Sequence, residues 1–138
     1  MVGNALEDAV SAFDGFGREL MRVYAGKSSN PERAQKQPFQ NLASASDTVK
    51  QLFAFDLSTV VEKQDWDFAL RCFQKRHLLA HKSGVIDDDY VRKTSDPTAI
   101  VGRKIVVIGD EVKRFVGIIK QLGTHFVAEL QQNTKTNP

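Results

Sequence analysis

The stretch DWDFALRCFQKRHLLAHK, residues 65–82, decides the fold of this chain. At 100° per residue, its apolar side chains fall on two separate lanes of a helix. One lane holds Trp66, Ala69, Leu70, Phe73 and Ala80, and the other holds Phe68, Cys72 and Leu79. A helix that is apolar on two sides is buried on two sides, so we expect it inside a bundle or against a partner subunit.

Apolar residues also recur at three- and four-residue steps on either side of this stretch. They predict long helices at residues 4–26, 44–55 and 110–131. A short helix, DDDYVRKT, is expected after residue 86, with Asp87 as its cap. The sequence therefore predicts an all-α fold, a helical bundle of four long helices plus one short helix.

The segments between the helices are expected to be irregular. Residues 27–41 are polar and contain two prolines, which predicts a long connection. Residues 98–109 include a Val/Ile-rich run that has no visible strand partner, so we expect a buried extended linker. Residues 132–138 are expected to be a frayed tail, and residues 1–138 to form a single domain.

Composition limits the function classes. The chain has 138 residues, with 19 Lys and Arg against 17 Asp and Glu, a net charge of +2. This near balance argues against a strongly basic protein that coats nucleic acid. A single cysteine and the absence of a secretory signal predict a cytoplasmic protein. No apolar run reaches the roughly 18 residues that a membrane span requires, so we expect no membrane partner.

Two of the three histidines, His77 and His81, share one face of the 65–82 helix, with Arg76 beside them. They are either structural, satisfied by hydrogen bonds in the core or an interface, or they bind a metal, or they transfer protons at a phosphate. HLLAH lacks the Glu of a zinc-binding HExxH, and His125 is far away in sequence. Imidazole titrates near neutrality, and arginine binds phosphate oxygens, which suits acid–base chemistry.

Several residues near this helix have ordinary structural interpretations. We expect Trp66 in the core or a dimer contact, Tyr90 in the packing of the short helix, and Cys72 to be a buried small apolar residue. His125 is assigned no role. Basic residues concentrate nearby, because Arg71, Lys75, Arg76 and Lys82 occur with no acid among them.

The stretch FQKRHLLAHKSGVIDDDYVRKTSD resembles the signature region of HEPN domains (higher eukaryotes and prokaryotes nucleotide-binding). That family has an Arg, commonly followed by a polar residue, and a His four to six residues after the Arg. Here Arg76, His77 and His81 match those positions. The Gly turn and the acidic short helix with Tyr90 also resemble family members. The specific resemblance covers about residues 66–96.

This resemblance implies a metal-independent endoribonuclease with a toxin, defence or stress-response role, and no cofactor. His81 would be general base or acid, Arg76 would hold the scissile phosphate, and His77 would orient the site or share proton transfer. The products would be a 2′,3′-cyclic phosphate and a 5′-OH. The residues expected to attract the RNA backbone are Arg71, Lys75, Lys82, Arg92 and Lys93.

The resemblance also implies a homodimer in which two Arg/His sets form one composite active site. An antitoxin or fused domains could hold such a protein inactive. The alternative is a non-catalytic HEPN module for dimerisation or nucleotide binding, part of a larger protein. A DNA-binding helical protein is less favoured, because no helix-turn-helix pair with a basic recognition helix stands out.

Overall fold

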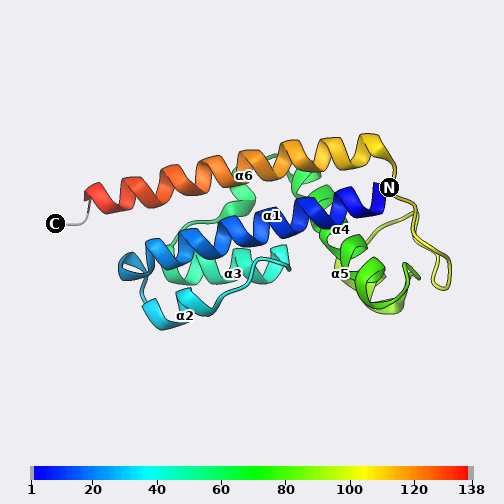
Figure 1. Ribbon diagram of the computed structural model, residues 1–138, viewed down its shortest axis with the longest axis horizontal. Helices are drawn as coiled ribbons and strands as arrows, with labels where there is room; N and C mark the ends of the chain where they lie inside the picture. The colour runs from blue at the N-terminus through cyan, green and yellow to red at the C-terminus, as the bar shows by residue number, and fades with distance from the viewer. Residues whose placement is uncertain (1, 137–138) are drawn as a thin grey trace.

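The computed structural model describes the backbone of residues 2–136 and the side chains of residues 4–132. Six α-helices and two 3₁₀ turns make up this part of the chain (Figure 1). They are α1 (Val2–Val23), η1 (Ala25–Lys27), α2 (Pro31–Lys36), α3 (Leu42–Phe53), η2 (Leu57–Thr59), α4 (Lys63–His81), α5 (Asp88–Thr94) and α6 (Gly109–Thr136). The described residues contain no strand, only an isolated bridge between Val85 and Lys104. The predicted all-α fold is confirmed.

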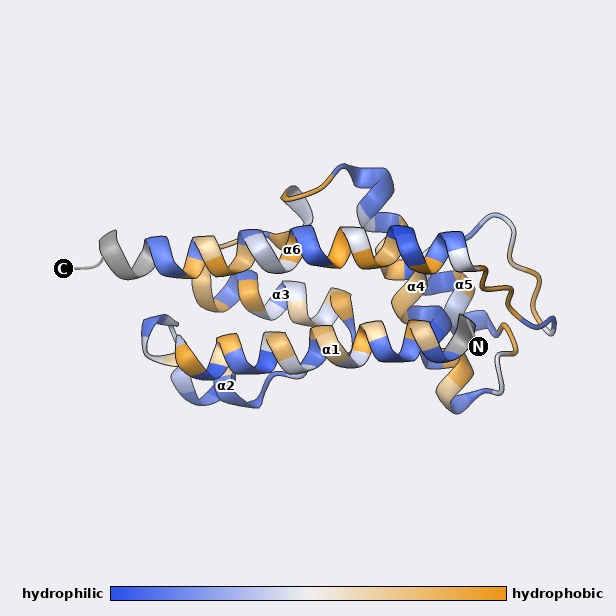
Figure 2. Cartoon of the chain, turned by 45° about the horizontal axis from the view of Figure 1, so that its top comes forward, coloured by the Kyte–Doolittle hydropathy of each residue, from blue (hydrophilic) through white to orange (hydrophobic). Residues whose placement is uncertain are grey.

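Helices α1 and α6 lie side by side and are parallel. Both run from the end of the molecule where the N-terminus lies to the opposite end, where the C-terminus lies (Figure 1). Helices α3 and α4 lie beneath this pair, and apolar residues of all four face inward (Figure 2). A chain of phenylalanine rings joins them. Phe13 lies edge-on to Phe39 and Phe73 at 5.9 Å from each, and Phe73 meets Phe115 at 5.3 Å.

Helix α4 is the central element, as its two apolar lanes predict. It contacts α1, α3, α5 and α6. Phe68, Cys72 and Phe73 are buried, and Trp66 packs partly buried against the same core. The last turn emerges from the bundle, so Leu79 and Ala80, both assigned to the apolar lanes, are exposed.

The long connection expected at residues 27–41 contains a helix that we did not predict. Asn30 caps α2 by accepting a hydrogen bond from the Arg33 amide, and Pro31 occupies the first turn. Six residues are too few to show a helical period, which explains the miss. Phe39, near the end of this segment, is fully buried and anchors it to the core.

The helix boundaries are set by caps. Helix α3 begins at Leu42, two residues before the predicted start. It begins there because the side chain of Asn41 accepts a hydrogen bond from the Ser44 amide. It ends at Phe53 because Ala54 adopts a left-handed conformation, with φ of 57°. Asp87 caps α5 as predicted, accepting from the Tyr90 amide at 2.8 Å.

The prediction of a buried linker at residues 98–109 is wrong. The segment is mostly exposed, with Ile100, Val101, Val106 and Ile108 each at least half accessible, and it reverses direction at a turn at residues 101–102. Its partner is the short stretch after α4, since the amide of Ile86 donates to the Arg103 carbonyl and that of Ile105 to the Gly84 carbonyl. This partner is too short to be recognised as a strand.

The predicted frayed tail is largely helical. Helix α6 continues past residue 131 to Thr136, and residues 137–138 lie outside the described part of the chain. No helix in the described residues is both long and apolar enough to span a bilayer.

Candidate functional site

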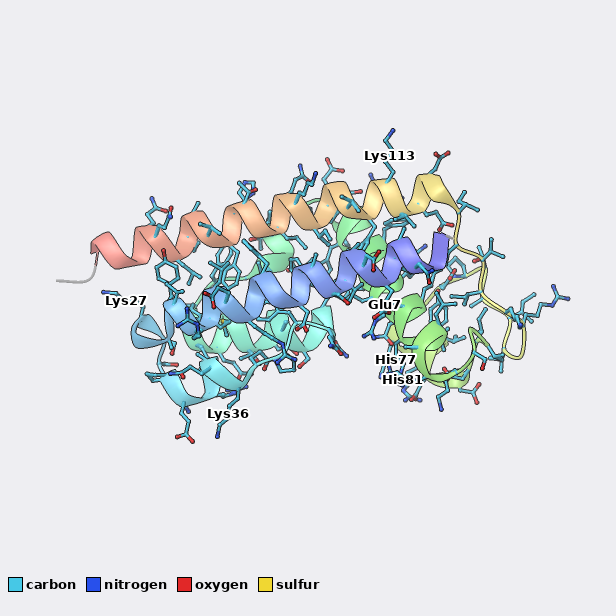
Figure 3. All side chains as sticks on the ribbon, viewed as in Figure 1. Glu7, Lys27, Lys36, His77, His81 and Lys113 are labelled. Atoms are coloured by element: carbon cyan, nitrogen blue, oxygen red, sulfur yellow. The ribbon has the colours of Figure 1, made fainter. Side chains whose placement is uncertain are left out.

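The candidate site lies on the last two turns of α4, where the helix leaves the bundle. His77 and His81 are four residues apart and therefore share a face. Both side chains are exposed, and their ring centroids are 4.9 Å apart (Figure 3). Two accessible imidazoles at this spacing can both reach one small group between or above them.

Arg76 precedes the pair and turns toward the protein instead of toward solvent. Its side chain is only 8% exposed. Nη2 donates to the Gln40 carbonyl at 3.3 Å, and Nε lies 3.9 Å from an Oε of Glu7. Both contacts are long for their type, and Nε, although buried, makes no hydrogen bond. Burying a guanidinium N–H without a partner is costly. The Nε–H of Arg76 is therefore a donor that no group of the folded chain uses.

Positive charge surrounds His77 and changes its protonation. Neighbouring protein atoms partly desolvate the ring of His77 and lower its pKa below the ordinary value, and the charges of His81, Arg76 and Lys93 lower the pKa further. Asp87 opposes this shift. His77 is therefore neutral at pH 7, the form that accepts a proton.

Glu7 of α1 belongs to this site and was not predicted. It is about half exposed and is the only acid recorded in an ion pair with Arg76 within the described residues. Figure 3 shows it on α1 at the same end of the molecule as the histidine pair. The sequence gives no signal for it, because which turn of α1 crosses α4 depends on the tertiary packing.

The segment that receives Arg76 is held by Asp14 of α1. The carboxylate of Asp14 accepts from the Phe39 amide at 2.6 Å and from the Gln40 side chain at 3.3 Å. Burial acts to raise the pKa of Asp14, but these hydrogen bonds and Arg18 hold it below its ordinary value. Asp14 thus fixes the backbone of Gln40 that Arg76 contacts.

The five residues predicted to bind RNA do not form one cluster. Lys82 and Lys93 are both exposed, and Lys93 is near enough to His77 to lower the pKa of that histidine. Arg92 is exposed and pairs with Asp89 within α5.

The other two residues predicted to bind RNA are partly buried and interact with groups of the protein. The Lys75 ammonium donates to the Val106 carbonyl at 3.1 Å and to Glu111 at 3.2 Å, and its side chain is only 14% exposed. Arg71 is partly buried, with an unpaired Nε, and its charge lowers the pKa of Asp96. The structure therefore separates Lys75 and Arg71 from the histidine pair.

The remaining polar residues of interest have structural partners. Cys72 is buried, and this burial raises the pKa of its thiol to about 12, so it stays protonated. Tyr90 is buried and donates to Asp96 at 2.8 Å, as its packing role predicts. Nδ1 of His125 lies 2.9 Å from the Gln121 carbonyl. Among the described residues, no group of three or more His, Cys, Asp or Glu is placed to hold a metal ion.

Comparison with known proteins gives no significant match to a family model, a curated protein or a solved structure. The arrangement itself can support proton transfer. It combines two accessible imidazoles, one of them held neutral, with a guanidinium that has an unused donor.

Proposed function

We propose that this chain is a metal-independent endoribonuclease of HEPN type, acting in a toxin, defence or stress response. The observation that carries the proposal is the exposed His77–His81 pair, with ring centroids 4.9 Å apart, next to the incompletely bonded Arg76. Transesterification of RNA needs a base for the 2′-OH, an acid for the leaving 5′-oxygen and positive charge at the phosphate. In this proposal His77 is the base, His81 is the acid and Arg76 is the positive charge.

The lowered pKa of His77 supports a division of roles within the pair. Neutral His77 takes the proton of the 2′-OH as that oxygen attacks the phosphorus. His81 acts as the general acid and gives a proton to the 5′-oxygen as the bond from phosphorus to that oxygen breaks. The products are a 2′,3′-cyclic phosphate and a 5′-OH, and no water is consumed in this step.

Arg76 stabilises the charge that develops on the phosphate. A charge-assisted hydrogen bond to a phosphate oxygen is stronger than a 3.3 Å bond to the Gln40 carbonyl. The guanidinium therefore exchanges that weak contact, and its 3.9 Å approach to Glu7, for the substrate. Lys82, Arg92 and Lys93 attract the flanking RNA backbone, which Coulomb attraction favours at low salt.

The test uses single-stranded RNA labelled at its 5′ end, incubated with purified protein in EDTA. We expect fragments that end in a cyclic phosphate. His77→Ala and His81→Ala should each reduce the rate by about 100-fold or more, the usual contribution of a positioned acid or base. His125→Ala is the matched control, because it removes an exposed imidazole on α6 away from the pair. Equal rates in all four proteins would refute the proposal.

A second candidate function is a non-catalytic module that binds a nucleotide. The burial of Arg76 favours it, because a guanidinium that stays on Gln40 cannot contact a scissile phosphate. This module would bind nucleotide with no strand cleavage, and Arg76→Ala would alter folding stability without affecting any rate. Calorimetric titration with mononucleotides, run beside the cleavage assay, separates the two functions.

Arg76, His77 and His81 all lie on the last two turns of α4 in one chain, so we expect the proposed chemistry to need no residue of a second copy. The composite cleft implied by the resemblance makes a different prediction. In that arrangement, a mixture of the Arg76→Ala and His81→Ala variants would regain activity through mixed dimers. With a site held in one chain, the mixture stays inactive.

A further inference from the structure

An apolar groove runs along the outer face of the α1–α6 pair. It has a volume of about 790 Å³ and is lined by small and apolar side chains of both helices. On α1 these include Ala12 and Phe16, and on α6 they include Gly123, Thr124 and Ala128. Figure 2 shows the face between the two helices turned toward the viewer. We name this surface the α1–α6 groove.

The groove exposes apolar surface that no part of the described chain covers. Phe16 is 41% exposed at its centre. On α6 the lining extends from Val116 to Gln131, about 22 Å at 1.5 Å per residue. The same face continues to Val23 at the end of α1, which is 55% exposed. Exposed apolar side chains along this length of two helices suit packing against another apolar surface.

Two charged residues that lie just before the first lining residues of the two helices are opposite in sign. Asp8 lies one turn before Ala12 on α1, and Lys113 lies one turn before Gly117 and two turns before Lys120 on α6. Neither Asp8 nor Lys113 makes an ion pair or hydrogen bond recorded among the described residues, and both are exposed. The α1 side therefore offers a free carboxylate, and the α6 side a free ammonium group.

Asp8 and Lys113 also stand at nearly the same height along the groove. A Cβ on Gly123 would lie 2.9 Å from the ring of Phe16, so these two residues are level. Because α1 and α6 run in the same direction, stepping back eight residues on each helix brings Asp8 level with Phe115. Lys113 is two residues, about 3 Å, from that point.

We propose that the α1–α6 groove binds the same groove of a second copy of this chain. A two-fold axis parallel to the groove stacks α1 of one copy on α6 of the other. Rotation about this axis does not move any residue along the groove, so residues that are level in one copy remain level across the interface. Each Asp8 then faces the other copy's Lys113, and the pair forms twice, as an isologous interface requires. Ala9 and Ala12 on α1 and Gly123 and Ala128 on α6 are small, which lets the two layers approach closely. The surface lies apart from the histidine pair, so the proposal does not depend on the proposed activity.

Sedimentation velocity over a range of concentrations up to about 100 µM tests this assignment. Wild-type protein should form a dimer. Asp8→Lys or Lys113→Asp alone places like charges opposite each other twice, and should weaken the dimer about tenfold or more. The double variant restores opposite charges and should recover the wild-type dissociation constant. Lys104→Asp, an exposed charge reversal on the 98–108 loop, is the matched control.

A bulky substitution tests the apolar contact independently. An added Cβ at Gly117 meets nothing within 4 Å, so Gly117→Arg fits the folded chain and places a large cation at the interface. It should abolish the dimer with an unchanged circular dichroism spectrum, whereas Gln35→Arg on α2 should have no effect. A wild-type chain that stays monomeric, or that binds only the helix of another protein, would overturn the proposal. A dimer insensitive to both Gly117→Arg and the charge variants would do the same.

Discussion

Asp14 couples the core to the candidate site, and its removal gives the sharpest test of the structure. Its carboxylate is mostly buried and accepts the Phe39 amide at 2.6 Å, the Gln40 side chain at 3.3 Å and Arg18 at 2.9 Å. Asp14→Ala removes all three contacts and leaves the Phe39 amide buried with no acceptor. This amide sits beside a fully buried ring, so the segment can reach water only by withdrawing Phe39 from the core.

The expected loss follows from these contacts. A buried amide bonded to a carboxylate contributes about 1.5–3 kcal/mol. The Gln40 contact is long and adds about 0.5 kcal/mol, at the low end for a hydrogen bond. Arg18 is half exposed, so its ion pair adds about 0.5 kcal/mol or less. Asp14→Ala should therefore lower the free energy of unfolding by about 2–4 kcal/mol. Asp14→Asn, which keeps one acceptor oxygen, should lose about 1 kcal/mol.

Urea denaturation at several pH values measures both effects. The pKa of Asp14 is lowered in the folded state, so its contribution is complete above 3.8, the ordinary value, and disappears as pH falls through the folded-state pKa. The wild type should lose more stability than Asp14→Asn over that acid range. An Asp14→Ala variant within about 0.5 kcal/mol of wild type at pH 7 would refute the reasoning, because surface substitutions already fall in that range.

Three further predictions concern packing and titration. Gly17→Ala should destabilise the fold by about 1–3 kcal/mol in the same urea assay, because the added Cβ would lie 2.4 Å from the Phe39 ring. At Gly15 an added Cβ meets nothing within 4 Å, so Gly15→Ala should stabilise the fold by up to about 1 kcal/mol. If His77 is the base, kcat/KM should rise with pH through an inflection below 6.5, and an inflection above 6.5 would contradict that role. Cys72 should resist iodoacetamide at pH 8 in the native protein and react in urea, as mass spectrometry would show, and rapid native labelling would contradict its burial.

The sequence predicted those elements whose periodicity is long or whose cap is unambiguous. Helix α4 was recognisable because two apolar lanes over nineteen residues have no other explanation. Asp87 was recognisable because an acid before a short helix suits its first turn. Helix α2 was not, since six residues show no period. The exposed 98–108 segment was misjudged because a Val/Ile-rich run usually indicates burial, and its partner at residues 84–86 is only a few residues long.

The candidate site was likewise only partly predictable from the sequence. That His77 and His81 share a face follows from helical spacing alone, and the structure places them accordingly. Which basic residues accompany them does not follow from spacing, because adjacent helical residues point in directions 100° apart. Lys75 therefore turns toward Glu111 of α6, while Arg76 turns toward Glu7 of α1. Both acids come from helices that are distant in sequence, so only the packing of α4 between α1 and α6 decides which of its cations serve the fold and which remain available to a ligand.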